Sequence, residues 1–200
     1  MRSNPRHGAP HTGKTHGPGQ SSQPSSFFFK RNPLKILGID PGLRITGYAC
    51  IEIDPPATSH AGLPEPRLID AGVIRLTVGD SVQARLAELE QDLIGILETH
   101  TPDEVCVEKL YSHYERPTTA IVMGHARGVV LLAAHRAGAA VTELAATEVK
   151  KSLTGHGHAT KRQMQESVKS QCRLAELPDP PDVADAIAIA LCAARRIVPV

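Results

Sequence analysis

Four acidic residues occupy places where a folded chain normally puts apolar side chains. They are Asp40, Glu108, Asp182 and Asp185. The first two each close a short apolar run, and the other two stand at the start of a nearly all-apolar segment over residues 180–197. A carboxylate buried without a partner is costly in free energy. We therefore expect a cation to be held where these acids meet.

Each acid also has an ordinary structural explanation. An aspartate before Pro-Gly, as at Asp40, commonly caps a turn, and a strand-end glutamate such as Glu108 commonly lies in solvent at the rim of a sheet. Asp182 and Asp185 are three residues apart, so a helix projects both from one face, roughly 5–6 Å apart at Cβ. For Asp185, the only charged residue between Val183 and Ala194, the alternative is a salt bridge to a buried Arg or Lys.

Taken together, the acids indicate metal-dependent phosphodiester chemistry. Hydrolysis by two metal ions requires several hard oxygen ligands around cations about 3.5–4 Å apart. Mg²⁺ binds carboxylates and retains water molecules. One ion can then activate a water molecule while the other stabilises the departing oxygen. We find no credible nucleophilic triad, so the sequence favours a metal-dependent nuclease.

The pattern of apolar residues predicts an α/β fold that brings these acids together. Strands are expected over residues 35–40, 44–53, 67–76, 104–108 and 139–144. Helices are expected over residues 81–99, 117–137, 146–153, 160–173 and 180–197. Thr160 with Gln163 predicts a capping box, and Asp179 is expected to cap the last helix. Three strands followed by alternating strands and helices predict a mixed five-stranded sheet flanked by helices.

The charge is distributed unevenly along the 200 residues. Residues 1–33 carry five basic side chains and no acid, whereas the rest has 17 basic and 21 acidic residues. The first 26 residues are rich in Gly, Pro, Ser and His, so we predict a disordered N-terminal extension over 1–33 and one folded domain over 34–200. The segment 8–15 fits the phosphate-loop pattern, but it lacks the flanking strand and helix which that mechanism needs.

The cysteines and the apolar runs indicate a cytoplasmic protein without a membrane span. None of the four cysteines forms a C-x-x-C pair, and all lie in apolar runs, as expected of free thiols in a reducing cytoplasm. No stretch approaches the ~20 apolar residues that a transmembrane helix needs.

Five short motifs follow one another in order between residues 35 and 197. They are Ile36–Gly42 with Thr46–Tyr48, Val107-Glu108, Gly124–Val129, Glu148–Lys151 with Thr154–Gly157, and Asp182–Ala190. Together they resemble the RuvC family of bacterial Holliday-junction resolvases. The match departs from the family at His125, where glutamine is usual, and at Tyr111, where phenylalanine is commoner.

This resemblance implies an RNase H-like fold and a homodimer that makes paired, symmetric nicks in four-way DNA junctions during recombination and DNA repair. It implies that the four acids are catalytic and bind two Mg²⁺ ions per subunit, with Mn²⁺ able to substitute. It places Lys150 and Lys161 near the scissile phosphates and Tyr111 in the junction as a wedge. It also implies the RuvA-RuvB branch-migration complex as a partner.

Other residues suggest contacts with DNA or with a second subunit. The segment 150–173 is strongly basic and includes Lys151, which we assign to DNA binding. Arg127 has two explanations, a DNA contact or a brace of the fold. The 117–137 helix carries an apolar strip that forms either part of the dimer interface or part of the core. The strip consists of Ile121, Val122, Val129, Leu132 and Ala133.

Two other classes of function are compatible with parts of the sequence. Asp40-Pro41-Gly42 with Gly47 also resembles the first phosphate motif of actin- and sugar-kinase-like ATP-binding domains, although 200 residues are too few for the second domain of that fold. A non-catalytic junction-binding module is the other alternative, and the presence of all four acids argues against it.

Overall fold

The computed structural model describes residues 32–54, 65–77, 79–110 and 117–197. The predicted extension, apart from Asn32 and Pro33, and the predicted wedge Tyr111 lie outside these residues. The strands are β1 (Leu34–Asp40), β2 (Ile45–Ile53), β3 (Arg67–Arg75), β4 (Glu104–Glu108) and β5 (Ala140–Leu144). The helices are α1 (Val82–His100), α2 (Pro117–Arg136), α3 (Ala146–Thr154), α4 (Lys161–Gln171) and α5 (Pro181–Ile197).

The five strands form one mixed sheet in the order β3-β2-β1-β4-β5. β1, β2 and β3 are antiparallel neighbours, whereas β1 pairs with β4 and β4 with β5 in parallel. The predicted mixed five-stranded sheet with flanking helices is thereby confirmed. In this topology the carboxyl ends of β1 and β4 lie side by side.

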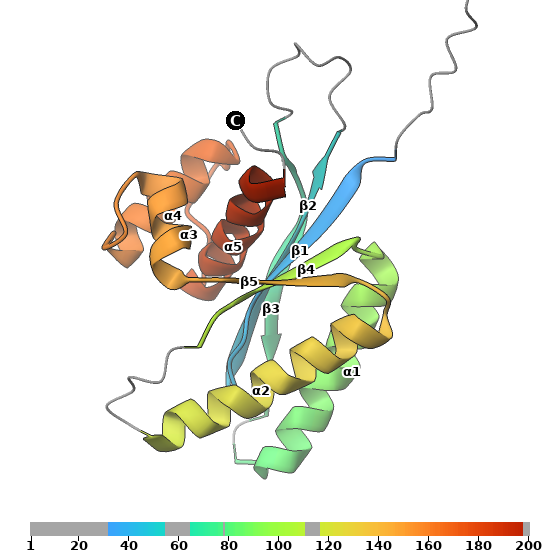
Figure 1. Cartoon of the computed structure of the whole chain (residues 1–200). Helices are drawn as coiled ribbons and strands as arrows, with labels where there is room; N and C mark the ends of the chain where they lie inside the picture. Colours follow the sequence, from blue (N-terminus) through green and yellow to red (C-terminus); the bar gives the residue numbers. More distant parts are fainter. Residues whose placement is uncertain (1–31, 55–64, 78, 111–116, 198–200) are drawn as a thin grey trace, which may run out of the picture. The chain divides into compact units, whose positions relative to one another are not determined.

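Helices cover both faces of the sheet (Figure 1). Side chains alternate between the faces along each strand. On β1, Ile36 packs into a core with α3, α4 and α5, whereas Leu37 packs into a second core with α1 and α2. On β4, Cys106 belongs to the first core and Val105 to the second. The residues at even positions of β1 and β4 therefore face α5.

Helix α5 lies unusually close to β1 and β2 because two glycines face it. A Cβ atom on Gly38 would lie 2.3 Å from the carbonyl oxygen of Ala186, and one on Gly47 would lie 2.1 Å from the carbonyl oxygen of Asp182. Any side chain at either glycine would push the helix off the sheet. Ala186 and Ala190 complete this contact from the helix side.

The helix ends lie within two residues of the predictions, and the largest difference is at α4, which ends at Gln171 and not at residue 173. Thr160 caps α4, and the reciprocal bonds with Gln163 confirm the predicted capping box. The predicted N-cap at Asp179 is wrong, since α5 begins at Pro181 and the Val183 amide donates to the Pro180 carbonyl. Proline suits the first helical position because it has no amide proton to leave unbonded.

Among the residues that the structure describes, no helix is both long and apolar enough to cross a lipid bilayer.

Candidate active site

Two of the four acids are brought together by strand pairing. Ile39 pairs with Val107 in the parallel β1–β4 ladder, so the next residues, Asp40 and Glu108, stand beside each other at the strand ends. Neighbouring strands are about 4.8 Å apart. Both residues share the face of Gly38 and Cys106, which is the face that α5 covers.

The other two acids reach the same place from the first turns of α5. Asp40 pairs with Gly47 in the β1–β2 ladder, and Gly47 contacts the main chain of Asp182. Asp185 follows one turn later and is half-buried in an otherwise buried helix face. The close packing on glycine therefore sets both α5 carboxylates over the ends of β1 and β4.

Asp40 lies at the centre of this acidic cluster. Burial, and after it the neighbouring Asp185, Glu108 and Asp182 carboxylates, together raise its pKa from 3.8 to about 7. The Lys161 ammonium acts in the opposite direction. A carboxyl group surrounded by three others is costly to ionise unless a cation is present.

Glu108 and Asp185 have raised pKa values for the same reasons. Burial is the largest cause for both, and the Asp185 charge adds to the effect at Glu108. The Lys150 ammonium lowers the pKa of both carboxyl groups, and Lys161 lowers that of Asp185. Two lysines thus supply positive charge at the edge of the cluster.

These lysines do not neutralise the cluster by direct pairing. Within the described part of the chain, none of the four acids forms an ion pair with a Lys, Arg or His side chain. The alternative that Asp185 is held by a buried Arg or Lys therefore finds no support. Carboxylate oxygens are hard ligands of the kind that divalent cations such as Mg²⁺ prefer, and these four carboxylates have no paired cation among the described residues.

The side chains are near one another without being closed around a single point. No three His, Cys, Asp or Glu side chains among the described residues are placed as ligands of one metal ion. Carboxylates repel one another, so a cluster without a cation is expected to stand open. Binding of a metal ion by these residues would require their side chains to turn toward one another.

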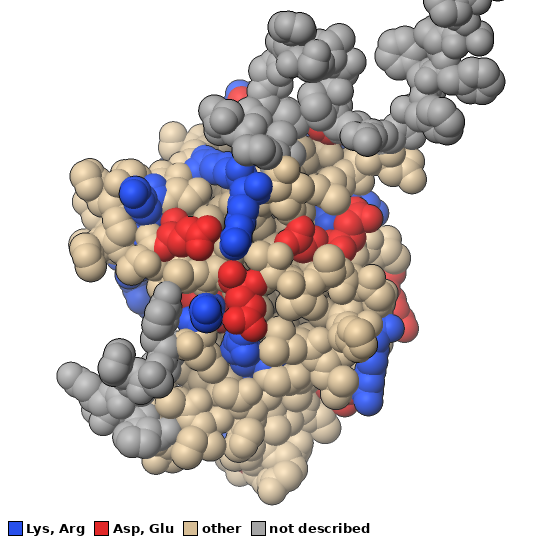
Figure 2. All heavy atoms as spheres, viewed as in Figure 1, with Lys and Arg blue, Asp and Glu red and all other residues tan. Residues whose placement is uncertain are grey.

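Two of the three predicted DNA-binding lysines, Lys150 and Lys161, lie near this cluster. Lys161 is the first residue of α4, and Lys150 lies in the last turns of α3, where it is half-buried. Lys151 is exposed. Between these helices, Gly155 ends α3 in the left-handed conformation, with a φ of 78°. Figure 2 shows acidic and basic side chains interspersed over the region of α3, α4 and α5.

Arg127 forms an ion pair with Glu143 of β5. Its side chain is 16% exposed, and its Nε atom is buried without a hydrogen-bond partner among the described residues. This pair joins α2 to the edge of the sheet, so the structure gives Arg127 a bracing role. A DNA contact by Arg127 stays a prediction.

The apolar strip on α2 divides between the two explanations that the sequence allowed. Ala133 is buried, and Val122 and Val129 pack against the core beneath α2. Ile121 and Leu132 are 61% and 46% exposed. Only these last two residues remain available for a contact with another molecule.

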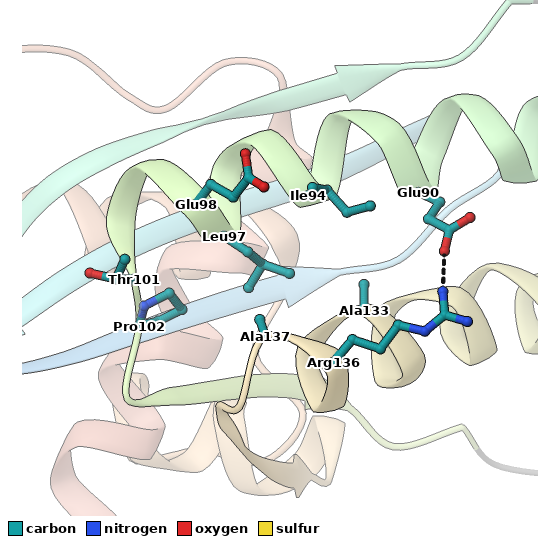
Figure 3. A pocket seen from close by; sticks show the side chains of 9 residues that line it. All are labelled: Glu90, Ile94, Leu97, Glu98, Thr101, Pro102, Ala133, Arg136 and Ala137. Atoms are coloured by element: carbon teal, nitrogen blue, oxygen red, sulfur yellow. Dashed lines mark hydrogen bonds and ion pairs between the residues drawn. The ribbon is translucent and has the colours of Figure 1, made fainter.

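A cavity of about 470 Å³ lies away from the acids, between the C-terminal parts of α1 and α2 (Figure 3). Ile94, Leu97 and Ala133 give it apolar walls, and the Arg136–Glu90 ion pair crosses its rim. It contains none of the four acids and lies at the opposite ends of β1 and β4. We therefore assign the chemistry to the acidic cluster and not to this cavity.

The sequence did not reveal how α5 is held against the sheet. Gly38 and Gly47 were part of recognisable motifs, but their contact with α5 depends on strand register. The sequence did contain one signal for this contact. Two strands each carry a glycine, Gly38 and Gly47, and the last helix carries the small residues Ala186 and Ala190 one turn apart.

The fold and the acids at the strand ends define the class of RNase H-like nucleases. Comparison with known proteins identifies the family within that class. The model of the family "Crossover junction endodeoxyribonuclease RuvC" matches residues 36–193. The chain therefore belongs to the RuvC family.

Individual relatives agree with this assignment. The crossover junction endodeoxyribonuclease RuvC of Rhodopirellula baltica is 48% identical over 157 residues, covering 78% of this chain and 84% of the relative. A Thermus thermophilus RuvC structure superposes with a TM-score of 0.71 at 30% identity and covers 82% of this chain and 96% of its own. T. thermophilus RuvC in complex with a Holliday junction substrate gives the same TM-score at 26% identity, covering 83% and 97%.

Proposed function

We propose that this protein is a structure-specific endonuclease that resolves four-way DNA junctions by paired, symmetric phosphodiester hydrolysis. The observation that carries this proposal is the gathering of four carboxylates from β1, β4 and α5 within a RuvC-family fold. A relative of the same fold has been seen with a Holliday junction substrate. The two alternatives, an ATP-binding domain and a non-catalytic module, gain no support from these comparisons.

Asp40, Glu108, Asp182 and Asp185 are proposed to hold two Mg²⁺ ions, which Mn²⁺ can replace. Bound metal would supply activation of a water molecule and stabilisation of the departing oxygen. The chain itself contributes the geometry: two strand ends and one helix turn hold the carboxylates while the domain excludes water from beneath them.

Lys150 and Lys161 are proposed to bind the phosphates on either side of the cleaved bond. Both ammonium groups lower pKa values within the acidic cluster, which supports a role for their positive charge beside a bound phosphate. Lys161 also begins a helix, where main-chain amides favour an anion. Lys151, Arg127 and Tyr111 are proposed as further DNA contacts, with Tyr111 stacking on a base.

A homodimer is proposed because a four-way junction has two equivalent strands to cut, and a two-fold dimer presents two equivalent sites. The exposed Ile121 and Leu132 on α2 support an interface there. We also propose the RuvA-RuvB complex as a partner. A reducing cytoplasm fits the free thiols of Cys50, Cys106 and Cys192, which are all buried.

The test is a nicking assay with a four-way junction and a linear duplex of the same sequence. Wild-type protein should nick the junction in Mg²⁺, leave the duplex intact and lose activity in EDTA. Asp40→Asn should bind the junction but not cut it, while the exposed Asp92→Asn should behave as wild type. Cleavage by Asp40→Asn at the wild-type rate would falsify the assignment of this residue.

A further inference from the structure

The turn that follows Asp40 is fixed by one buried hydroxyl group. Thr46 Oγ1 donates a hydrogen bond to the Gly42 carbonyl at 2.8 Å and accepts one from the Gly42 amide at 3.0 Å. Thr46 is fully buried and is the only buried polar residue in the described part of the chain. The turn is also tight, since a Cβ on Gly42 would lie 2.2 Å from the Ile45 carbonyl oxygen.

An arginine from α1 holds the next residue of the same turn. Arg85 Nη1 donates to the Leu43 carbonyl at 2.9 Å, and Leu43 is buried. The Arg85 Nε atom is buried without a hydrogen-bond partner among the described residues. Leaving such a donor unbonded costs free energy. Among the described residues, Arg85 is therefore joined to the turn through one hydrogen bond, from Nη1 to the Leu43 carbonyl.

The turn directly follows Asp40, which strand pairing places beside Glu108 at the end of β1. Neighbouring like charges repel one another, so the position of the Asp40 carboxylate depends on how firmly the adjoining chain is held. Two successive residues of the turn, Gly42 and Leu43, are bonded to side chains outside it.

We propose that Thr46 and Arg85 form a turn clamp that positions Asp40 for binding of a divalent cation. The clamp rests on the proposed function, because it positions a residue of the proposed metal site. Thr46 and Arg85 are positioning residues, since neither reaches the cluster itself. Arg85 also makes the first turns of α1 part of the support of the active site.

The test compares Thr46→Val and Arg85→Met with the conservative variants Thr46→Ser and Arg85→Lys. Thr99→Val, which removes a hydroxyl bonded within α1, and Arg136→Met, which removes a surface ion pair, are the matched controls. Binding of Mn²⁺ by the DNA-free protein is measured from the loss of the free-ion EPR signal. Thermal unfolding in EDTA identifies variants that are folded.

The clamp predicts that Thr46→Val and Arg85→Met bind Mn²⁺ about 10- to 100-fold more weakly, the usual cost of losing support behind a metal ligand. The Mg²⁺ concentration for half-maximal cleavage should rise by a similar factor, with unchanged junction affinity. Thr46→Ser should recover most of the binding, and both controls should match wild type. If Thr46→Val does not fold, Arg85→Met and Arg85→Lys decide the outcome.

Wild-type Mn²⁺ affinity in the folded clamp variants would overturn the clamp, and so would equal weakening in the two controls. These results are distinct from failure of the proposed function. If wild-type protein neither binds Mn²⁺ nor cuts a junction, both the proposed metal site and the clamp are refuted. If wild-type protein and the clamp variants all bind Mn²⁺ and cut the junction equally well, only the clamp is refuted and the proposed function stands.

Discussion

Replacing Asp40 with asparagine should stabilise the metal-free protein while it abolishes cleavage. The pKa of Asp40 is raised from 3.8 to about 7 by burial and by the Asp185, Glu108 and Asp182 charges. The folded state therefore binds the Asp40 proton more tightly than the unfolded state does. As the pH rises from the unfolded-state pKa of 3.8 to the folded-state pKa of about 7, the contribution of Asp40 to the free energy of unfolding falls.

The size of the effect follows from the same pKa values. Each unit of difference in pKa corresponds to about 1.4 kcal/mol. Because the pKa rises from 3.8 to about 7, ionised Asp40 should lower the free energy of unfolding by about 4 kcal/mol at pH 8. Asparagine has nearly the same shape and no charge. In EDTA, the free energy of unfolding of Asp40→Asn should therefore exceed that of wild type by about 4 kcal/mol at pH 8 and by less than half of that at pH 5.

Urea denaturation in EDTA at pH 5 and pH 8 measures this gain, with Asp92→Asn as the exposed control. Saturating Mg²⁺ should stabilise wild-type protein and leave Asp40→Asn nearly unchanged, because only a folded site binds the ion. An Asp40→Asn variant no more stable than wild type at pH 8 would refute the reasoning. A gain of equal size at both pH values would also refute it.

Three further predictions concern the pH profile, the packing of α5 and the dimer. Cleavage by wild type should rise between pH 6 and pH 8 as Asp40 loses its proton, and higher Mg²⁺ should move the midpoint of the rate profile to lower pH; a flat profile contradicts this. Gly47→Ala should lose about 1–3 kcal/mol of stability and most of its activity, because the added Cβ meets the Asp182 carbonyl. The control Gly95→Ala in α1 has open space around it and should gain up to about 1 kcal/mol of stability in the same urea titrations. Ile121→Asp should shift the sedimentation coefficient from dimer to monomer without a change in circular dichroism, and an unchanged dimer would exclude Ile121 from the interface.

The order of the strands and helices could be predicted from the sequence because its apolar pattern is consistent at every level. Short apolar runs predicted the strands, and the helical spacing of apolar residues in α1 was unambiguous. The acids were recognisable because each stands at an end of an apolar segment or inside one. Asp182 and Asp185 were the clearest, since helical spacing alone places them on one face.

The contacts that hold the acids together could not be predicted, because they depend on register and on the main chain. The amide of Gly42 and the carbonyl of Leu43 carry no sequence signal for the groups that bond them. The role of Gly47 follows from its pairing with Asp40 across β1 and β2, which a one-residue slip would abolish. Arg127 was left open because its partner, Glu143, is on a different element.

The central claim is that acids from β1, β4 and α5 bind divalent cations at one place. Diffraction from crystals soaked in Mn²⁺, recorded at a wavelength where manganese scatters anomalously, tests it most directly. We expect anomalous peaks bounded by the carboxylates of Asp40, Glu108, Asp182 and Asp185. The claim would be contradicted if protein that cuts junctions gave crystals in which manganese peaks appear only elsewhere on the protein.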